Sequence, residues 1–346
     1  MSLSPYSRRK PLLKRAFVFF MAVILLAAIG GAFCWHFYPL PFRRVIVQPP
    51  REVLFALREL QPSAFFEHKI IHEKIPEPET VVLKPEKADD IKIVADIRIP
   101  EGDSPKPAVL LLHGSSPWGR KNGLILWLGY RLWERGWVVM APDARGFGDT
   151  EDPKNIKEPK NWDVQRDIKR CMEYIEKETP LDPARLVVIG HSMGAGHALE
   201  GALLDNRVSR MVLIGPARHI HGAIDTSQWN LIRFSSDRKL DELIPESVFL
   251  AISEKSDFRA FVKKGLISQA HKPILLIDGE LEGADNLNYL ADLVKIAGPN
   301  LHYRTLKGTG HYCGVVSLPP TNHIFIRTDL FEPFFTDIMN FLETDF

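Results

Sequence analysis

The chain has 346 residues, which is long enough for one large globular domain with an appendage. Its 44 lysine and arginine residues nearly balance its 43 aspartate and glutamate residues, so no excess charge points to a nucleic acid partner. The hydrophobic share of 45% and the charged share of 25% are those of an ordinary globular protein and exclude a disordered chain.

The N-terminus departs from this average. Residues 1–15 carry five basic side chains, and the next 20 residues, 16–35, carry no charge. A helix of that length is about 30 Å long and matches the hydrocarbon core of a bilayer. We therefore predict a single transmembrane signal-anchor over residues 16–38. The basic residues before it predict a cytosolic N-terminus, with the rest of the chain on the exterior, periplasmic or lumenal side.

A cleaved signal peptide is the alternative to this anchor. Small residues at Ala28, Gly30 and Ala32 could form a cleavage site, and the protein would then be secreted. Residues 39–79 read as a connector with one short helix near residues 51–60.

From residue 80 onward, strand and helix patterns alternate. Two strands are expected between residues 80 and 100, joined by a polar turn, and "KPAVLLLHG" (106–114) is a nearly all-apolar strand. The further strands are expected over residues 136–143, 185–190, 210–215, 272–279 and 301–306, and the helices over 122–135, 162–178, 193–204, 284–298 and the last 18 residues. This alternation predicts an α/β fold over residues 80–346, with a mostly parallel central sheet, helices on both faces and an antiparallel edge.

Residues 216–271 are too long for a simple connection between two strands. They contain helical stretches with several large aromatic side chains. We predict a small helical cap inserted into the domain at this point.

The segment "GHSMG" (190–194) fits the pattern G-x-S-x-G, with Ser192 at its centre. An expected strand precedes it and an expected helix follows it, as in a nucleophile elbow. The glycines relieve crowding where the turn presses the strand against the helix, so that the serine hydroxyl can project from the sheet edge. Ser192 is therefore the candidate nucleophile.

A serine hydroxyl needs a base, and "KGTGHYCG" provides His311 in a glycine-rich loop after the last expected strand. An acyl-transfer reaction also needs backbone N–H groups that stabilise an oxyanion. We expect these from Met193, which follows the nucleophile, and from Ser115, in the loop after the strand that ends near residue 112.

These motifs resemble the α/β-hydrolase superfamily over roughly residues 80–346. "LLHGSS", "APDARGFGDT", "GHSMGAG" and "GTGHY" stand in the family's order. The chain looks most similar to the dienelactone-hydrolase, prolyl-oligopeptidase and acyl-esterase branches. The resemblance implies a Ser-His-acid triad and a structural role for Asp143.

The acid is where the chain departs from the family pattern. Members of the family commonly carry H-G-x-x-D after the seventh strand, whereas this chain reads "DGELEGAD" (278–285). The position that corresponds to the family's aspartate is Glu282, which we expect to orient His311. Asp285 is the alternative acid.

The sequence predicts a membrane-anchored serine hydrolase that cleaves the acyl bond of a small molecule, most simply a carboxylic ester. A serine peptidase or a thioesterase of the same fold is the alternative. A non-catalytic binding or scaffold protein is a second class of function. The expected chemistry needs no organic cofactor and no metal, and the three cysteines match no metal motif or disulfide framework.

Overall fold

The computed structural model describes the chain from residue 57 to residue 344, with gaps. The gaps are residues 62–63, 65–66, 68, 88–89, 217–242 and 318–321, together with the side chains of residues 284–286. The predicted transmembrane helix over residues 16–38 lies outside the described residues. Within them, no helix combines the length and the apolar character that crossing a bilayer requires.

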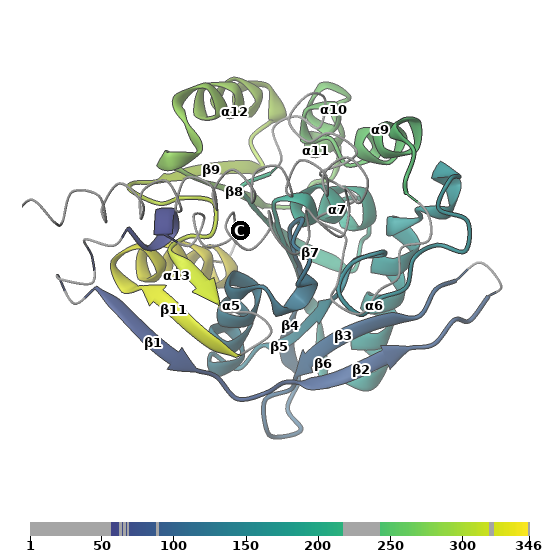
Figure 1. Ribbon diagram of the computed structural model, residues 1–346, viewed down its shortest axis with the longest axis horizontal. Helices are drawn as coiled ribbons and strands as arrows, with labels where there is room; N and C mark the ends of the chain where they lie inside the picture. Colours follow the sequence, from purple (N-terminus) through teal and green to yellow (C-terminus); the bar gives the residue numbers. More distant parts are fainter. Residues whose placement is uncertain are drawn as a thin grey trace, which may run out of the picture. The chain divides into compact units, whose positions relative to one another are not determined.

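An eight-stranded sheet forms the centre of the domain, in the order β2–β3–β5–β4–β6–β7–β8–β9 (Figure 1). The strands are β2 (Glu79–Leu83), β3 (Ile93–Arg98), β4 (Lys106–Leu112), β5 (Val138–Pro142), β6 (Leu181–His191), β7 (Val208–Ile214), β8 (Ile274–Gly279) and β9 (Leu301–Leu306). β3 is antiparallel to both of its neighbours, and all the pairs from β5 to β9 are parallel. The predicted parallel sheet with an antiparallel edge is confirmed.

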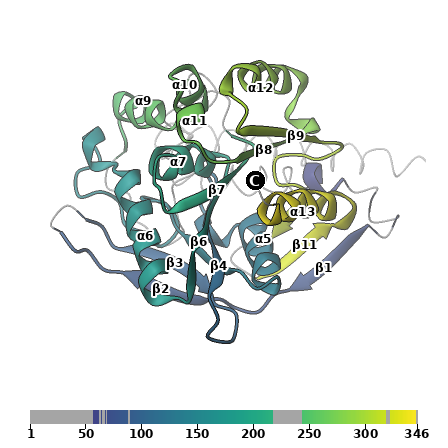
Figure 2. The ribbon, with the colours of Figure 1, turned by 180° about the vertical axis from the view of Figure 1, so that it is seen from behind.

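Helices cover both faces of this sheet (Figure 2). α5 (Gly123–Glu134) and α13 (Thr328–Glu343) pack on one face, and α6 (Val164–Glu178), α7 (Met193–Ala202) and α12 (Ala284–Ala297) pack on the other. The helices predicted from the sequence are thus present, with ends shifted by a few residues.

The alternation of side chains along β4 explains why both faces are apolar. Val109 and Leu111 belong to the core that includes α5 and α13, whereas Leu110 and Leu112 belong to the core that includes α6 and α7. Successive side chains of a strand point to opposite faces, so a strand covered on both sides needs a continuous apolar run.

A second, three-stranded antiparallel sheet was not predicted. It is formed by β1 (Ile70–Lys74), β11 (His323–Arg327) and β10 (Val315–Ser317), in that order. β1 lies in the predicted connector, and its residue Ile70 pairs with Arg327 at the far end of the chain. A five-residue, mostly exposed strand lacks the alternation of apolar and polar residues that would identify it. The neighbouring residues do not indicate its pairing with a distant segment either.

Three short helices occupy the described part of the predicted cap. They are α9 (Glu246–Lys255), α10 (Phe258–Lys263) and α11 (Leu266–Gln269). The helices expected in this region are therefore present, and the rest of the predicted cap, residues 217–242, lies outside the described residues.

The packing of α13 predicts a large loss of stability on truncation of its apolar face. Phe334 is fully buried against the sheet. Phe334→Ala should lower the free energy of unfolding by about 3–5 kcal/mol, because it removes a buried ring and leaves a cavity. Ile296→Ala, at a side chain that is 63% exposed, should change it by less than about 0.5 kcal/mol. Urea unfolding followed by tryptophan fluorescence measures both values, and equal values for the two variants would contradict this packing.

Candidate active site

Ser192 lies on the turn between β6 and α7, in a backbone conformation that non-glycine residues rarely adopt. Its φ is +55° and its ψ is −117°. Its backbone N–H donates to the carbonyl oxygen of Ile214 at 2.8 Å, which ties the turn to the neighbouring strand. Such a strained turn on an ordered strand end is the geometry of a nucleophile elbow.

The glycines beside Ser192 allow this turn to close. A Cβ atom on Gly190 would lie 2.2 Å from the carbonyl oxygen of Gly194, and one on Gly194 would lie 2.3 Å from the carbonyl oxygen of Leu112. Neither position can hold a side chain unless the backbone moves. The steric reason that the sequence suggested for these glycines is therefore present in the structure.

His311 lies in the loop after β9, and its ring is paired with Glu282. The Nδ1 atom of His311 lies 2.7 Å from Oε1 of Glu282, and each side chain is less than one quarter exposed. Glu282 ends the short 3-10 helix Glu280–Glu282, which follows β8 directly. Asp285, the alternative acid, lies in the first turn of α12, and its side chain is outside the described part of the chain.

The pairing shifts the pKa of both groups. Burial alone would lower the pKa of His311, but the hydrogen bond and the negative charge of Glu282 outweigh it, so the pKa is raised. Burial alone would raise the pKa of Glu282, but the same contact with His311 outweighs it, so that pKa is lowered. The structure thus favours a charged pair.

Contacts with His191 hold the loop of His311 next to the elbow. The two imidazole rings lie 4.6 Å apart between centroids, and Nε2 of His191 donates to the backbone carbonyl oxygen of His311 at 2.9 Å. Gly215, at a φ of +50°, leaves room for the ring, because a Cβ atom there would lie 3.2 Å from Nδ1 of His311. His311 therefore lies at the carboxyl ends of β6 and β7, in contact with His191, the residue that precedes Ser192.

The loop after β4 lies against the same turn. A Cβ atom on Gly114 would lie 2.9 Å from Cβ of Ser192. Within the described part of the chain, the backbone N–H groups of Ser115 and Met193 donate to no other group. Ser115 follows Gly114 in this loop and Met193 follows Ser192, so both of the predicted oxyanion donors border the turn of the candidate nucleophile.

His113 holds this loop in place and stays neutral. Its Nδ1 lies 2.6 Å from the carbonyl oxygen of Gly114, and its Nε2 accepts from the N–H of Ala144 at 2.8 Å. Burial lowers the pKa of His113 to about 4. Its two ring nitrogens are thus occupied, and it cannot act as a base toward Ser192.

Asp143 lies in a buried network below this loop. It forms an ion pair with Arg120 and accepts from the backbone N–H groups of Arg120 and Asp149 at 2.7 and 2.8 Å. Burial raises the pKa of Asp143 to about 6. These contacts connect two loops, which is the structural role that the family resemblance implies.

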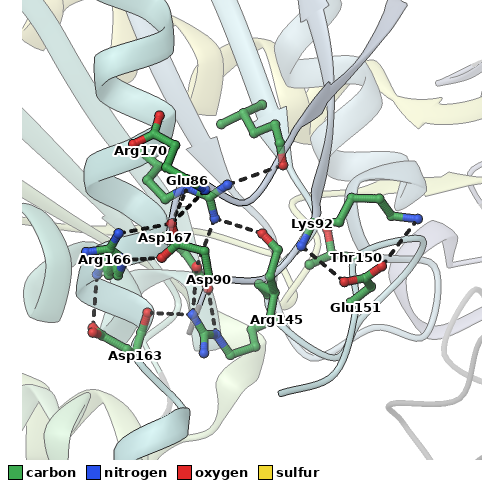
Figure 3. Close-up of polar contacts among 12 residues, drawn as sticks. Glu86, Asp90, Lys92, Arg145, Thr150, Glu151, Asp163, Arg166, Asp167 and Arg170 are labelled. Carbon is green, nitrogen blue, oxygen red and sulfur yellow. Dashed lines mark hydrogen bonds and ion pairs between the residues drawn. The ribbon is translucent and has the colours of Figure 1, made fainter. Parts of the chain in front are cut away.

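A second ionic network fixes the "D-x-R-G-x-G" loop onto α6 (Figure 3). Arg145 binds Asp167 through two hydrogen bonds, each 2.8 Å long. Arg166, one residue earlier on the same helix, binds Asp90 in the turn between β2 and β3. The bidentate pairs orient both loops against one helix.

Helix α9, which lies in the predicted cap, packs close to the elbow. Its residues Val248 and Phe249 belong to a small apolar cluster that includes Trp162, and the side chain of Met193 packs against the cluster. A Cβ atom on Gly196 would lie 2.5 Å from the carbonyl oxygen of Ser256, at the end of α9. The apolar cluster of α9 therefore contacts Met193, the residue that follows the candidate nucleophile.

The sequence reasoning missed one charged residue at this site. Glu59, in the predicted connector, is 2% exposed and lies against the loop of His311. It stands in the apolar stretch "VLFALREL", where a single carboxylate reads as the polar face of a helix. No local pattern marks it as a partner of a loop 250 residues later.

Comparisons with known proteins agree with the fold. Residues 103–270 match the family described as "Serine aminopeptidase, S33", which is just under half of the chain. The esterase EstD of Thermotoga maritima is 28% identical over 134 residues, 37% of this chain and 32% of that protein. The quorum-quenching protein AidA of Acinetobacter baumannii is 28% identical over 126 residues, 36% of this chain and 40% of that protein. The chain spans 41% of the length of two further curated relatives, both from Escherichia coli.

Two solved structures share the architecture of the chain. A 2,6-dihydroxy-pseudo-oxynicotine hydrolase has a TM-score of 0.54 at 18% identity, covering 77% of this chain and 68% of that chain. Est1E of Butyrivibrio proteoclasticus, solved with ferulic acid, has a TM-score of 0.53 at 17% identity. The match covers 73% of this chain and 96% of that chain. The predicted α/β-hydrolase fold is confirmed.

The ion pair between His311 and Glu282 makes a prediction about stability and pH. Because the pKa of His311 is raised, its contribution to the free energy of unfolding is complete below about pH 6.5. That contribution is lost as the pH rises through the folded-state pKa of His311. Because the pKa of Glu282 is lowered, its contribution to the free energy of unfolding is complete above about pH 4.5. That contribution is lost as the pH falls through the folded-state pKa of Glu282. Glu282→Gln should therefore destabilise the protein most between about pH 4.5 and 6.5, where both groups are charged, and less as the pH rises through the folded-state pKa of His311, as measured by urea unfolding. A difference that does not vary with pH would contradict a charged pair.

Proposed function

We propose that this α/β-hydrolase-fold protein is a serine hydrolase that cleaves a carboxylic ester of a small molecule. The triad is Ser192, His311 and Glu282. The observation that carries the proposal is the 2.7 Å contact between Nδ1 of His311 and Glu282, in a loop that contacts His191, the residue before the strained Ser192. A contact at Nδ1 leaves Nε2 as the ring nitrogen that can accept the proton of a serine hydroxyl.

The mechanism follows from this arrangement. Nε2 of His311 takes the proton of Ser192 as Oγ forms a bond to the acyl carbon. The N–H groups of Ser115 and Met193 stabilise the negative charge that develops on the carbonyl oxygen. His311 then returns the proton to the departing alcohol, and an acyl-enzyme remains. Water attacks this intermediate with His311 as the base, while Glu282 stabilises the imidazolium in both steps.

The comparisons support an ester more than another acyl bond. An esterase is among the curated relatives, and a structure that holds ferulic acid is among the similar folds. The matched family is described as a serine aminopeptidase, which makes a peptide bond the second candidate. Activity on aminoacyl amides in the absence of ester hydrolysis would favour this second candidate.

We also propose that residues 16–38 anchor the enzyme in a membrane, with residues 1–15 in the cytosol and the catalytic domain on the other side. The uncharged 20-residue run and the preceding basic residues support this topology. The full chain should stay with membranes in alkaline carbonate, and protease should reach the catalytic domain only from the non-cytosolic side. Release of a shorter protein into the medium would favour a cleaved signal peptide instead.

Labelling with a fluorophosphonate tests the nucleophile. The full chain should be labelled at Ser192, and Ser192→Ala should abolish labelling and lower kcat for ester hydrolysis by at least about 10³-fold. Ser268→Ala is the matched control, because Ser268 is exposed on α11 and should be dispensable. An unlabelled wild-type chain would favour the non-catalytic binding protein over the hydrolase.

Two neutralising substitutions compare the candidate acids. Glu282→Gln should lower kcat by about 10²–10⁴-fold, because the ring of His311 loses the group that orients it and stabilises its charge. Asp285→Asn should leave kcat within a few-fold of wild type. A larger loss in Asp285→Asn would transfer the role of the acid to that residue.

A further inference from the structure

The segment Leu57–Gln61 contacts both loops of the proposed acid–histidine pair. We call it the connector segment, because it lies in the predicted connector between the anchor and the catalytic domain. On the acid side, Nη2 of Arg58 donates to the carbonyl oxygen of Leu281 at 2.6 Å. The positive charge of Arg58 also contributes to lowering the pKa of the adjacent Glu282.

On the histidine side, the carboxylate of Glu59 fills the turn that carries His311. The N–H of Gly314 donates to Oε2 at 3.4 Å, and the N–H of Tyr312 is a second donor to the carboxylate. A Cβ atom on Gly310 would lie 2.3 Å from Oε1, so the glycine is needed for the carboxylate to approach. Glu59 therefore contacts the backbone on both sides of His311.

Contacts from the opposite side fix the connector segment in this position. The guanidinium of Arg327 donates to Oε1 of Gln61 at 3.0 Å and to the carbonyl oxygen of Leu60 at 3.5 Å. The amide of Gln61 donates to the carbonyl oxygen of Gly308 at 3.5 Å. Arg327 belongs to β11, so the second sheet holds the connector segment against the catalytic loops.

The charges around Glu59 give it an electrostatic effect on His311. Burial raises the pKa of Glu59, and the charge of His311 and the N–H groups of the loop act against this. Glu282, at the same site, repels it. The charged groups that face His311 are Glu282, Glu59 and Asp278, and all three raise its pKa, while the neutral ring of His191 faces it from the elbow.

A buried carboxylate is costly unless its contacts compensate for the lost hydration. An apolar side chain could pack against the same turn without that cost. The carboxylate instead points at the backbone of the loop whose histidine must carry a positive charge during the proposed reaction. This combination of burial, contact and charge calls for a role beyond packing.

We propose that Glu59 is a positioning residue, which holds the loop of His311 and stabilises the imidazolium that forms when His311 takes the proton of Ser192. The connector segment is then part of the active site and not a passive tether. This inference rests on the proposed function, because it assigns Glu59 an effect on the proposed base.

The first test measures His311 without reference to any substrate. Diethyl pyrocarbonate modifies the neutral imidazole, and the side chain of His311 is 23% exposed. The rate of its modification in the full chain, followed against pH by peptide mass spectrometry, gives a titration midpoint. In Glu59→Gln this midpoint should move to lower pH, because the neutral amide no longer stabilises the imidazolium.

Glu67→Gln is the matched control. Glu67 lies in the same predicted connector, but it is 56% exposed and pairs with Lys69. The midpoint of His311 should be unchanged in this variant. An unchanged midpoint in Glu59→Gln, in a chain that unfolds at the wild-type urea concentration, would overturn the inference.

The second test separates positioning from folding by kinetics. Glu59→Ala should lower kcat by up to about 100-fold with little change in KM, because the loop of His311 loses its contacts and the base is displaced. Glu59→Gln keeps the acceptor oxygen, so it should recover most of kcat, while the acidic limb of its pH profile lies at lower pH than in wild type. Wild-type kcat in both folded variants would overturn the inference.

The two tests distinguish this inference from the proposed function. If the wild-type chain is not labelled at Ser192, the serine hydrolase proposal fails, whatever the midpoint of His311. If Ser192 is labelled and the midpoint of His311 is the same in wild type and Glu59→Gln, only the role of Glu59 fails.

Discussion

The close contact between β6 and α7 is the constraint on which the site depends. A Cβ atom on Gly190 would collide with the backbone of Gly194, and one on Gly194 would collide with the end of β4, while Ser192 between them takes a positive φ. This strain persists because the hydrogen bond from Ser192 to Ile214 and the buried carboxyl ends of β6 and β7 determine the turn. The serine is thus fixed at the carboxyl end of β6. The loops that follow β4, β8 and β9 begin at the same edge, because parallel strands end on one side of a sheet.

Within the described residues, His113, His191 and His311 lie at this edge, and their surroundings give them different chemistry. His113 and His191 are buried without a carboxylate partner, so burial lowers the pKa of each and both rings stay neutral. His311 has nearby carboxylates, and its pKa is raised. Only His311 can therefore gain and hold a proton near neutral pH. The two neutral rings instead hold the backbone, His113 in the loop after β4 and His191 in the loop of His311 itself.

The sequence predicted the parts of the molecule that local patterns encode. Apolar runs on the buried strands, the glycines around Ser192 and the order of the motifs were sufficient for the central sheet and for the edge where Ser192 and His311 lie. The strand β1 and the buried position of Glu59 could not be predicted in this way. Both depend on contacts with residues about 250 positions later, and neither has a distinctive pattern of its own. Long-range pairing of short polar segments is specified by the assembled tertiary structure and not by their own residues.

The connector segment makes such long-range contacts with the loops of the proposed acid–histidine pair. Arg58 contacts the loop of Glu282, and Glu59 contacts the loop of His311, so one short helical turn contacts the loops of both members of the pair. The loops themselves follow different strands, and their relative position decides whether the hydrogen bond between Nδ1 and the carboxylate can form. A segment that contacts both loops limits how far they can separate.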